Sequence, residues 1–259
     1  MKSLARHIPN ILTCISLAFG FYAAILGISG HYFCAMTAIF TAAIFDFADG
    51  LAARLLKAYS AMGKELDSLA DIISFGVAPG MMLFSFLNQL LHNLSWNDSF
   101  CSIIILLVAF TIPIFSSLRL AKFNIDDRQK SSFIGLPVPA HAILWSSLIT
   151  VLAADTSSGY SIFPQLAVLL TSIPTEIMLI SLFVSVVATS LLMVSDIPMF
   201  SLKITSFSWK ANKMPYILIS SAMLFILLFG TVGISATVLL YIFLSFYEKI
   251  YKKRQLCLH

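Results

Sequence analysis

The stretch DFADGLAARLLKAYSAMGKELDSLAD, residues 46–71, concentrates charge in a chain that otherwise runs from one apolar segment to the next. It contains four aspartates, which are Asp46, Asp49, Asp67 and Asp71. Of the 259 residues, 59% are hydrophobic and 11% are charged, whereas soluble domains carry roughly 25% charged residues. This composition predicts a polytopic membrane protein and excludes a soluble globular enzyme.

Eight apolar stretches are each long enough, at about eighteen to twenty-three residues, to cross a ~30 Å hydrocarbon layer as a helix. They cover approximately residues 10–30, 33–54, 67–91, 100–119, 137–154, 175–195, 214–230 and 232–250. Helix is expected because isolated strands in lipid would leave backbone groups unpaired. The first stretch lacks a small-residue cleavage pattern, so we expect a retained span. The sequence therefore predicts an all-α protein with about eight transmembrane helices and one membrane-embedded domain, residues 1–259.

The distribution of Lys and Arg supports this count. With eight spans, all sixteen Lys and Arg residues fall on one side of the membrane and none on the other. The positive-inside rule then places both termini and the loop that carries Arg54 and Lys64 in the cytoplasm. We therefore expect a multi-pass protein of the cell (inner) membrane with its aspartates facing the cytoplasm. A net charge of +4 gives no reason to expect nucleic acid as a partner.

Helical spacing aligns the aspartates with small residues. The i, i+3, i+4 and i+7 positions at the end of the second helix, and successive i+4 positions opening the third, form two stripes. These stripes are Asp46, Asp49, Gly50 and Ala53, and then Gly63, Asp67 and Asp71. A buried carboxylate needs a partner, and four hard oxygen ligands suit Mg²⁺ or Mn²⁺ acting on phosphates. The small residues leave room for a planar or phosphorylated group. The cysteines show no zinc-ligand spacing.

The pattern D-x2-D-G-x2-A-R-x8-G-x3-D-x3-D over residues 46–71 resembles the full signature of the CDP-alcohol phosphatidyltransferases. The resemblance implies a membrane enzyme that transfers a phosphatidyl group from a CDP-linked lipid to an alcohol and releases CMP. It implies that all four aspartates bind metal, that Asp67 and Asp71 are catalytic, and that Asp71 is also the general base. By the same resemblance, the CDP-lipid contacts are Asp49, Gly50, Ala53, Arg54 and Gly63. The role of Arg54 stays open between phosphate contact and pairing with an aspartate.

Three further stretches predict the acceptor. NILT (10–13), RLAKFN (119–124) with FIGLPVPA (133–140), and VSDIPMFSLK (194–203) resemble the integral-membrane phosphatidylserine synthases within this family. The resemblance implies CDP-diacylglycerol and L-serine as substrates. Members of the family commonly dimerise, so a homodimer is a candidate oligomeric state. It also makes residues 214–250 an extension of a six-helix core. Serine carries a carboxylate and an ammonium group, so its site needs a cation and acceptors. We assign this binding to Arg119, Asn124 and Lys203.

Two alternatives remain at this point. The first keeps the reaction class and changes the acceptor to glycerol 3-phosphate, an inositol phosphate or choline. The second is an ion-coupled transporter, because acidic residues within membrane spans often mark ion pathways. Transporters place such residues near the midplane between repeated halves. Here the acids gather at one face and the sequence shows no repeat, which favours the enzyme.

Overall fold

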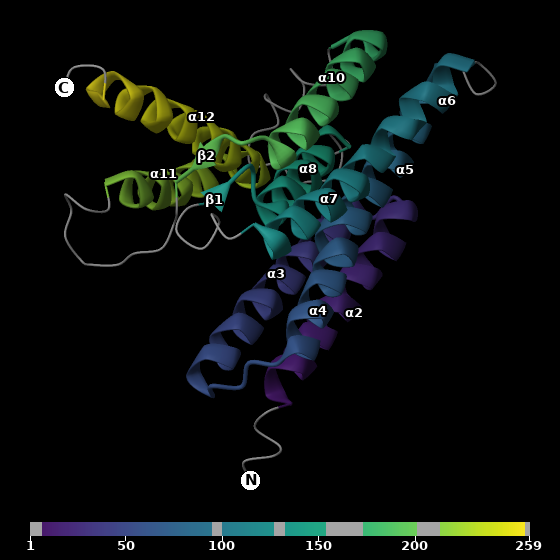
Figure 1. Ribbon diagram of the computed structural model, residues 1–259. Coiled ribbons are helices and arrows are strands. Elements are labelled where there is room, and N and C mark those ends of the chain that lie inside the picture. Colours follow the sequence, from purple (N-terminus) through teal and green to yellow (C-terminus); the bar gives the residue numbers. More distant parts are fainter. Residues whose placement is uncertain (1–6, 95–99, 127–132, 154–172, 201–212, 257–259) are drawn as a thin grey trace.

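The computed structural model describes residues 7–94, 100–126, 133–153, 173–200 and 213–256. These residues form helices and one pair of two-residue strands (Figure 1). The elements are α2 (Ile8–Ile28), α3 (Tyr32–Leu55), α4 (Ala61–Asp71), η1 (Ile72–Val77), α5 (Ala78–Asn93), α6 (Phe100–Leu107), η2 (Val108–Phe110), α7 (Thr111–Ile125), β1 (Phe133–Ile134), α8 (Val138–Leu152), α10 (Thr175–Val194), β2 (Pro198–Met199), α11 (Lys213–Phe229) and α12 (Thr231–Leu256). The prediction of an all-α membrane protein is confirmed.

The helices coincide with the eight predicted stretches. Six are long and apolar enough to cross a membrane, and two shorter apolar helices cover 138–152 and 214–229. The number of spans and the side on which the termini lie stay predictions. The third long helix, formed by α4, η1 and α5, starts at Ala61 rather than at residue 67, because Ser60 caps it by accepting a hydrogen bond from the Gly63 N–H at 2.9 Å. The fourth continues to Ile125 rather than ending at 119.

Small residues on α2 let the third long helix pack closely against it. A Cβ added to Gly20 would lie 2.2 Å from the Ser74 Oγ and 2.5 Å from the Ser74 Cα. A Cβ added to Gly27 would lie 2.7 Å from the Met82 Cγ. Close backbone approach through small residues is a common way for membrane helices to associate. In Figure 1 the purple α2 accordingly runs alongside α4 and α5.

Hydroxyl groups near the aspartates connect α2 to the third long helix and to α3. The Ser74 Oγ donates to the Ser16 carbonyl at 3.2 Å, and the Ser16 Oγ donates to the Ala42 carbonyl at 2.9 Å. Ser74 lies on η1, a π-helical turn that begins directly after Asp71, with the Ala78 N–H bonded to the Ile73 carbonyl. Such π turns often occur at functional sites. The three helices that surround the aspartates are therefore held in one register.

The strands β1 and β2 bring together two stretches that are far apart in sequence. They pair antiparallel, with Phe133 opposite Met199. The Gly135 N–H continues the contact by donating to the Ile197 carbonyl at 2.8 Å. Gly135 has a φ of +76°, and an added Cβ would lie 2.2 Å from the Met193 carbonyl oxygen, so this turn requires glycine. The stretches 133–140 and 194–203 that resemble the synthases thus meet, although 201–203 lie outside the described residues.

Candidate active site

The aspartate cluster lies between α3 and α4, which both pack against α2. One carboxylate oxygen from each of Asp46, Asp49 and Asp67 lies within 4.8 Å of the other two. Asp71, one turn beyond Asp67 on α4, lies close enough to interact with Asp46 and Asp67. Its Oδ1 is buried and has no hydrogen-bond partner among the described residues. The structure therefore brings together all four aspartates that the spacing aligned.

These carboxylates have no basic partner among the described residues. No Lys or Arg nitrogen there forms an ion pair within 4.0 Å of any of the four. Two carboxylates with charges about 4.8 Å apart repel by roughly 3 kcal/mol at an effective dielectric constant of about 20. Such repulsion inside a helix pair needs a cation to balance it. Oxygen ligands alone, with one oxygen buried and unpartnered, fit Mg²⁺ or Mn²⁺.

Thr13 on α2 belongs to this site and was not predicted. Its Oγ1 donates a hydrogen bond of 2.6 Å to the Asp49 Oδ2, and both residues are buried. Its stretch NILT was noted from the sequence only as part of the resemblance. The same stretch supplies Asn10, whose Oδ1 would lie 3.0 Å from a Cβ on Gly63. Thus α2 forms a third wall beside the two aspartate helices.

The other signature residues differ in how much space surrounds them. A Cβ on Gly50 would meet only the Arg54 Nη2, at 3.7 Å, so this glycine borders open space. Arg54 is exposed, and its Nε donates to the Gly50 carbonyl at 3.0 Å rather than to an aspartate. Ala53 is half-buried on the same helix. Among the described residues, Arg54 therefore bonds to its own helix and forms no pair with an aspartate.

The three residues assigned to the acceptor have different surroundings. Arg119 on α7 is 5% exposed, and within the described part of the chain its Nε and Nη2 have no hydrogen-bond partner. Its guanidinium lies over the Phe123 ring, 5.8 Å from the centroid, and within electrostatic reach of Asp71. Asn124 is engaged instead, because its Nδ2 donates to the Ser68 Oγ at 3.0 Å. Lys203 lies outside the described residues. Arg119 is therefore the acceptor candidate with free, buried donors.

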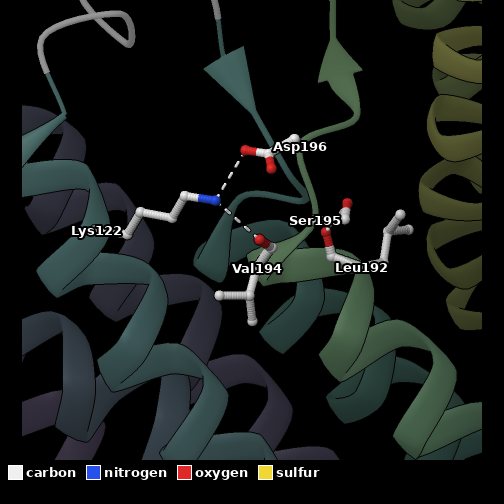
Figure 2. A network of polar contacts seen from close by, with 5 residues as sticks. All are labelled: Lys122, Leu192, Val194, Ser195 and Asp196. Atoms are coloured by element: carbon white, nitrogen blue, oxygen red, sulfur yellow. Dashed lines mark hydrogen bonds and ion pairs between the residues drawn. The ribbon is translucent and has the colours of Figure 1, made fainter.

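Lys122, one turn after Arg119, connects α7 to the end of α10 (Figure 2). Its Nζ lies 2.9 Å from the Asp196 Oδ1 and donates to the Val194 carbonyl at 3.1 Å. The second contact satisfies a carbonyl at the C-terminus of α10, where helices lack internal partners. This pair therefore fixes the segment that leads into β2 relative to the helix that carries Arg119.

The comparison with known proteins agrees with this geometry. The family model described as CDP-alcohol phosphatidyltransferase matches residues 6–187. That range contains the whole aspartate cluster together with Thr13 and Arg119. This chain is a CDP-alcohol phosphatidyltransferase family member. The family resemblance found in the sequence is confirmed, and so is the assignment of the chain to a class of membrane enzymes.

Several relatives of this family member carry names that state an acceptor. A CDP-diacylglycerol–serine O-phosphatidyltransferase of Bacillus subtilis is 40% identical over 134 residues, which cover 52% of this chain and 70% of the relative. Another of that name from Mycobacterium bovis is 34% identical over 200 residues, 74% of this chain and 60% of the relative. An archaetidylserine synthase of Methanothermobacter thermautotrophicus is 29% identical over 169 residues, 64% of this chain and 68% of the relative.

His141 lies on α8 of this family member and connects α8 to α10 through hydrogen bonds. It is fully buried, and its Nε2 lies 3.1 Å from both the Thr189 Oγ1 and the Trp145 Nε1. The indole N–H also lies 3.0 Å from the Thr189 Oγ1. The three side chains join α8 to α10. His141 is therefore a hydrogen-bonded residue between two helices.

Proposed function

We propose that this protein transfers the phosphatidyl group of CDP-diacylglycerol to the hydroxyl of L-serine, giving phosphatidylserine and CMP. The observation that carries the proposal is the arrangement of four aspartates beside a buried arginine with unpartnered donors. Carboxylates that hold a divalent cation suit the pyrophosphate of a CDP-lipid. A free, buried guanidinium suits the carboxylate of serine. The names of the relatives point to the same acceptor.

We further propose Mg²⁺ or Mn²⁺ as the cofactor, held by Asp46, Asp49, Asp67 and Asp71. The cation would neutralise the pyrophosphate and make the phosphorus more electrophilic. The family resemblance assigns Gly50, Ala53 and Gly63 to the cytidine nucleotide, and of these Gly50 borders open space. Arg54 contacts the phosphates. Asp49 is held in place by Thr13. The helices α3 and α4 thus form the side of the site that binds the CDP-lipid.

Asp71 acts as the general base in this proposal. Its carboxylate takes the proton from the serine hydroxyl as the serine oxygen forms a bond to the lipid phosphorus. The phosphorus–oxygen bond to CMP breaks, and CMP leaves with the electron pair of that bond. The buried, unpartnered Oδ1 supplies a free acceptor for this proton. Asp67, one turn earlier on α4, is the second catalytic residue.

The acceptor side of the site is assigned to α7. Arg119 binds the serine carboxylate, and its place near Asp71 directs the serine hydroxyl toward the base. Asn124, which bonds to Ser68 on α4, is assigned to serine binding together with Arg119. Lys203 is the third residue that we assign to serine binding, on the basis of the sequence. This side of the site distinguishes serine from alcohols that lack a carboxylate.

The proposal includes the setting of the enzyme. We place the aspartates on the cytoplasmic side of the cell (inner) membrane, on the basis of the segregation of Lys and Arg. A homodimer is the proposed assembly. To test the orientation, the native cysteines are replaced and one cysteine is introduced at either terminus. Labelling of that cysteine in intact cells reports the side of the membrane on which the terminus lies. Sedimentation in detergent tests the dimer.

An acceptor screen tests the reaction. Purified enzyme is incubated with CDP-diacylglycerol, Mg²⁺ or Mn²⁺, and in turn L-serine, glycerol 3-phosphate, an inositol phosphate and choline. We expect CMP release with L-serine and little with the other alcohols. Release with another alcohol but not with L-serine would contradict the serine assignment and retain the reaction class. Absence of metal-dependent CMP release with every acceptor would favour the transporter alternative.

A further inference from the structure

The last two helices lie beyond the region that matches the family model. The match ends at residue 187, whereas α11 and α12 start at Lys213 and Thr231. In Figure 1 they extend to one side, but the inner end of α12 lies beside α8 and β2. The Ser235 Oγ on α12 lies 2.7 Å from the Ser147 Oγ on α8, and both are buried. The extension is therefore joined to the six-helix core.

Tyr241 makes the second connection, and it reaches the stretch associated with the acceptor. It is 6% exposed, and its hydroxyl donates to the Phe200 carbonyl at 3.2 Å. The two rings pack edge to face, with centroids 4.9 Å apart and planes at 62°. A buried carbonyl away from water needs a donor. One side chain of α12 thus holds both the backbone and the ring of Phe200.

Phe200 directly follows β2, so this contact acts on the paired segment. At the other end of the segment, Lys122 contacts Asp196 and the Val194 carbonyl. Residues 194–200 are therefore fixed from α7 at one end and from α12 at the other. The guanidinium of Arg119 also lies within electrostatic reach of Tyr241. Tyr241 consequently links the C-terminal extension to the acceptor side of the site.

We infer that Tyr241 is a positioning residue for the acceptor alcohol, and this rests on the function proposed above. Tyr241 holds Phe200, and in this inference residues 194–200 form the wall of the acceptor site beside Arg119. The extension formed by α11 and α12 then belongs to the acceptor side of the enzyme. The CDP-lipid side, on α3 and α4, is independent of it.

Separate Michaelis constants for the two substrates test this role. Tyr241→Phe keeps the ring against Phe200 and removes the hydroxyl, while Tyr241→Leu removes both. We expect Tyr241→Phe to raise the KM for L-serine about threefold to tenfold, the effect of one hydrogen bond. Tyr241→Leu should raise it further. The KM for CDP-diacylglycerol should stay unchanged in both variants. Tyr22→Phe, which changes an exposed tyrosine on α2, is the control and should leave both constants unchanged.

The outcomes separate this inference from the proposed function. Wild-type enzyme is measured first. If it uses an alcohol other than serine, the serine assignment fails. The variants are then assayed with the alcohol that the wild type uses. Equal rises in both KM values, or lower thermal stability with unchanged KM values, would show a merely structural role and overturn the inference. Absence of CMP release with every alcohol would contradict both proposals. A rise confined to the acceptor in Tyr241→Phe would support the positioning role.

Discussion

The Thr13 hydroxyl on α2 donates to the Asp49 carboxylate on α3 across 2.6 Å, and both side chains are buried. This hydrogen bond holds one oxygen of Asp49 and thereby fixes the orientation of the carboxylate. A group that orients a metal ligand in this way changes metal affinity by about tenfold to a hundredfold. The helix α2 is thus part of the proposed metal site.

Thr13→Val removes this hydrogen bond with little change in side-chain shape. We expect the concentration of Mg²⁺ or Mn²⁺ that gives half-maximal activity to rise about tenfold, since Asp49 loses its orienting donor. Activity at saturating metal should fall less. Titration of CMP release with metal measures both values. Thr37→Val is the control, because that exposed hydroxyl on α3 bonds only within its own helix. An unchanged titration in Thr13→Val would contradict the role of Thr13.

Asp67→Asn and Asp71→Asn test the carboxylates themselves. Each amide keeps the side-chain volume and removes a negative charge, so we expect CMP release to fall by at least roughly 10²-fold, the usual contribution of general acid–base groups. Chelation of metal with EDTA should abolish release, and added Mg²⁺ or Mn²⁺ should restore it. Glu65→Gln removes an exposed acid from the same helix and should have little effect. Full activity in both aspartate variants would reject the assignment.

The sequence predicted the helices and the aspartate cluster because both depend on local patterns. Apolar length specifies a membrane helix, and i+3 and i+4 spacing specifies which residues share a face. The start of α4 was predicted six residues late, because hydropathy detects the apolar part of a helix and misses a polar turn capped by Ser60. Local pattern therefore located the site and left the helix boundary uncertain by about one to two turns.

Tertiary contacts account for what the sequence did not predict. Thr13 has the composition of an ordinary helix threonine, and only the packing of α2 on α3 gives it Asp49 as a partner. Two-residue strands carry no periodic pattern, so the pairing of β1 with β2 was not predicted. Arg119 and Asn124 looked equivalent as polar groups near the membrane face. Burial separates them, because it leaves the guanidinium unpartnered and the amide bonded.

Gly135→Ala tests the turn that docks the β1 segment on α10. A positive φ costs a non-glycine residue about 1–2 kcal/mol, and here the added Cβ would also collide with the Met193 carbonyl. Gly30→Ala is a matched control, because Gly30 has a φ of +78° but no atom within 4 Å of its added Cβ. We expect both variants to lose stability in denaturant unfolding, Gly135→Ala by clearly more. Equal losses would show that the predicted collision with Met193 has no effect.

The contacts of Lys122 predict that replacing Lys122 lowers stability more than replacing Asp196 does. Asp196 has a 72% exposed side chain, and exposed ion pairs contribute about 0–1 kcal/mol, so Asp196→Asn should change stability little. Lys122→Met also removes the donor to the Val194 carbonyl, which adds roughly 0.5–1.5 kcal/mol. Lys122→Arg can keep both contacts and serves as the control. Thermal unfolding in detergent measures the difference, and similar losses in Asp196→Asn and Lys122→Met would contradict it.

The buried guanidinium of Arg119 predicts a variant that loses activity without losing stability. Because Arg119 has unpartnered donors, Arg119→Leu removes a desolvated charge and should unfold at the same temperature as wild type or higher. Its kcat/KM for L-serine should fall about tenfold to a hundredfold through loss of a charge-assisted contact. L-Serinamide, which lacks the carboxylate, should lose little. Equal losses with serine and serinamide would contradict carboxylate binding by Arg119. Arg54→Leu should instead raise the KM for CDP-diacylglycerol, because Arg54 lies on the CDP-lipid side.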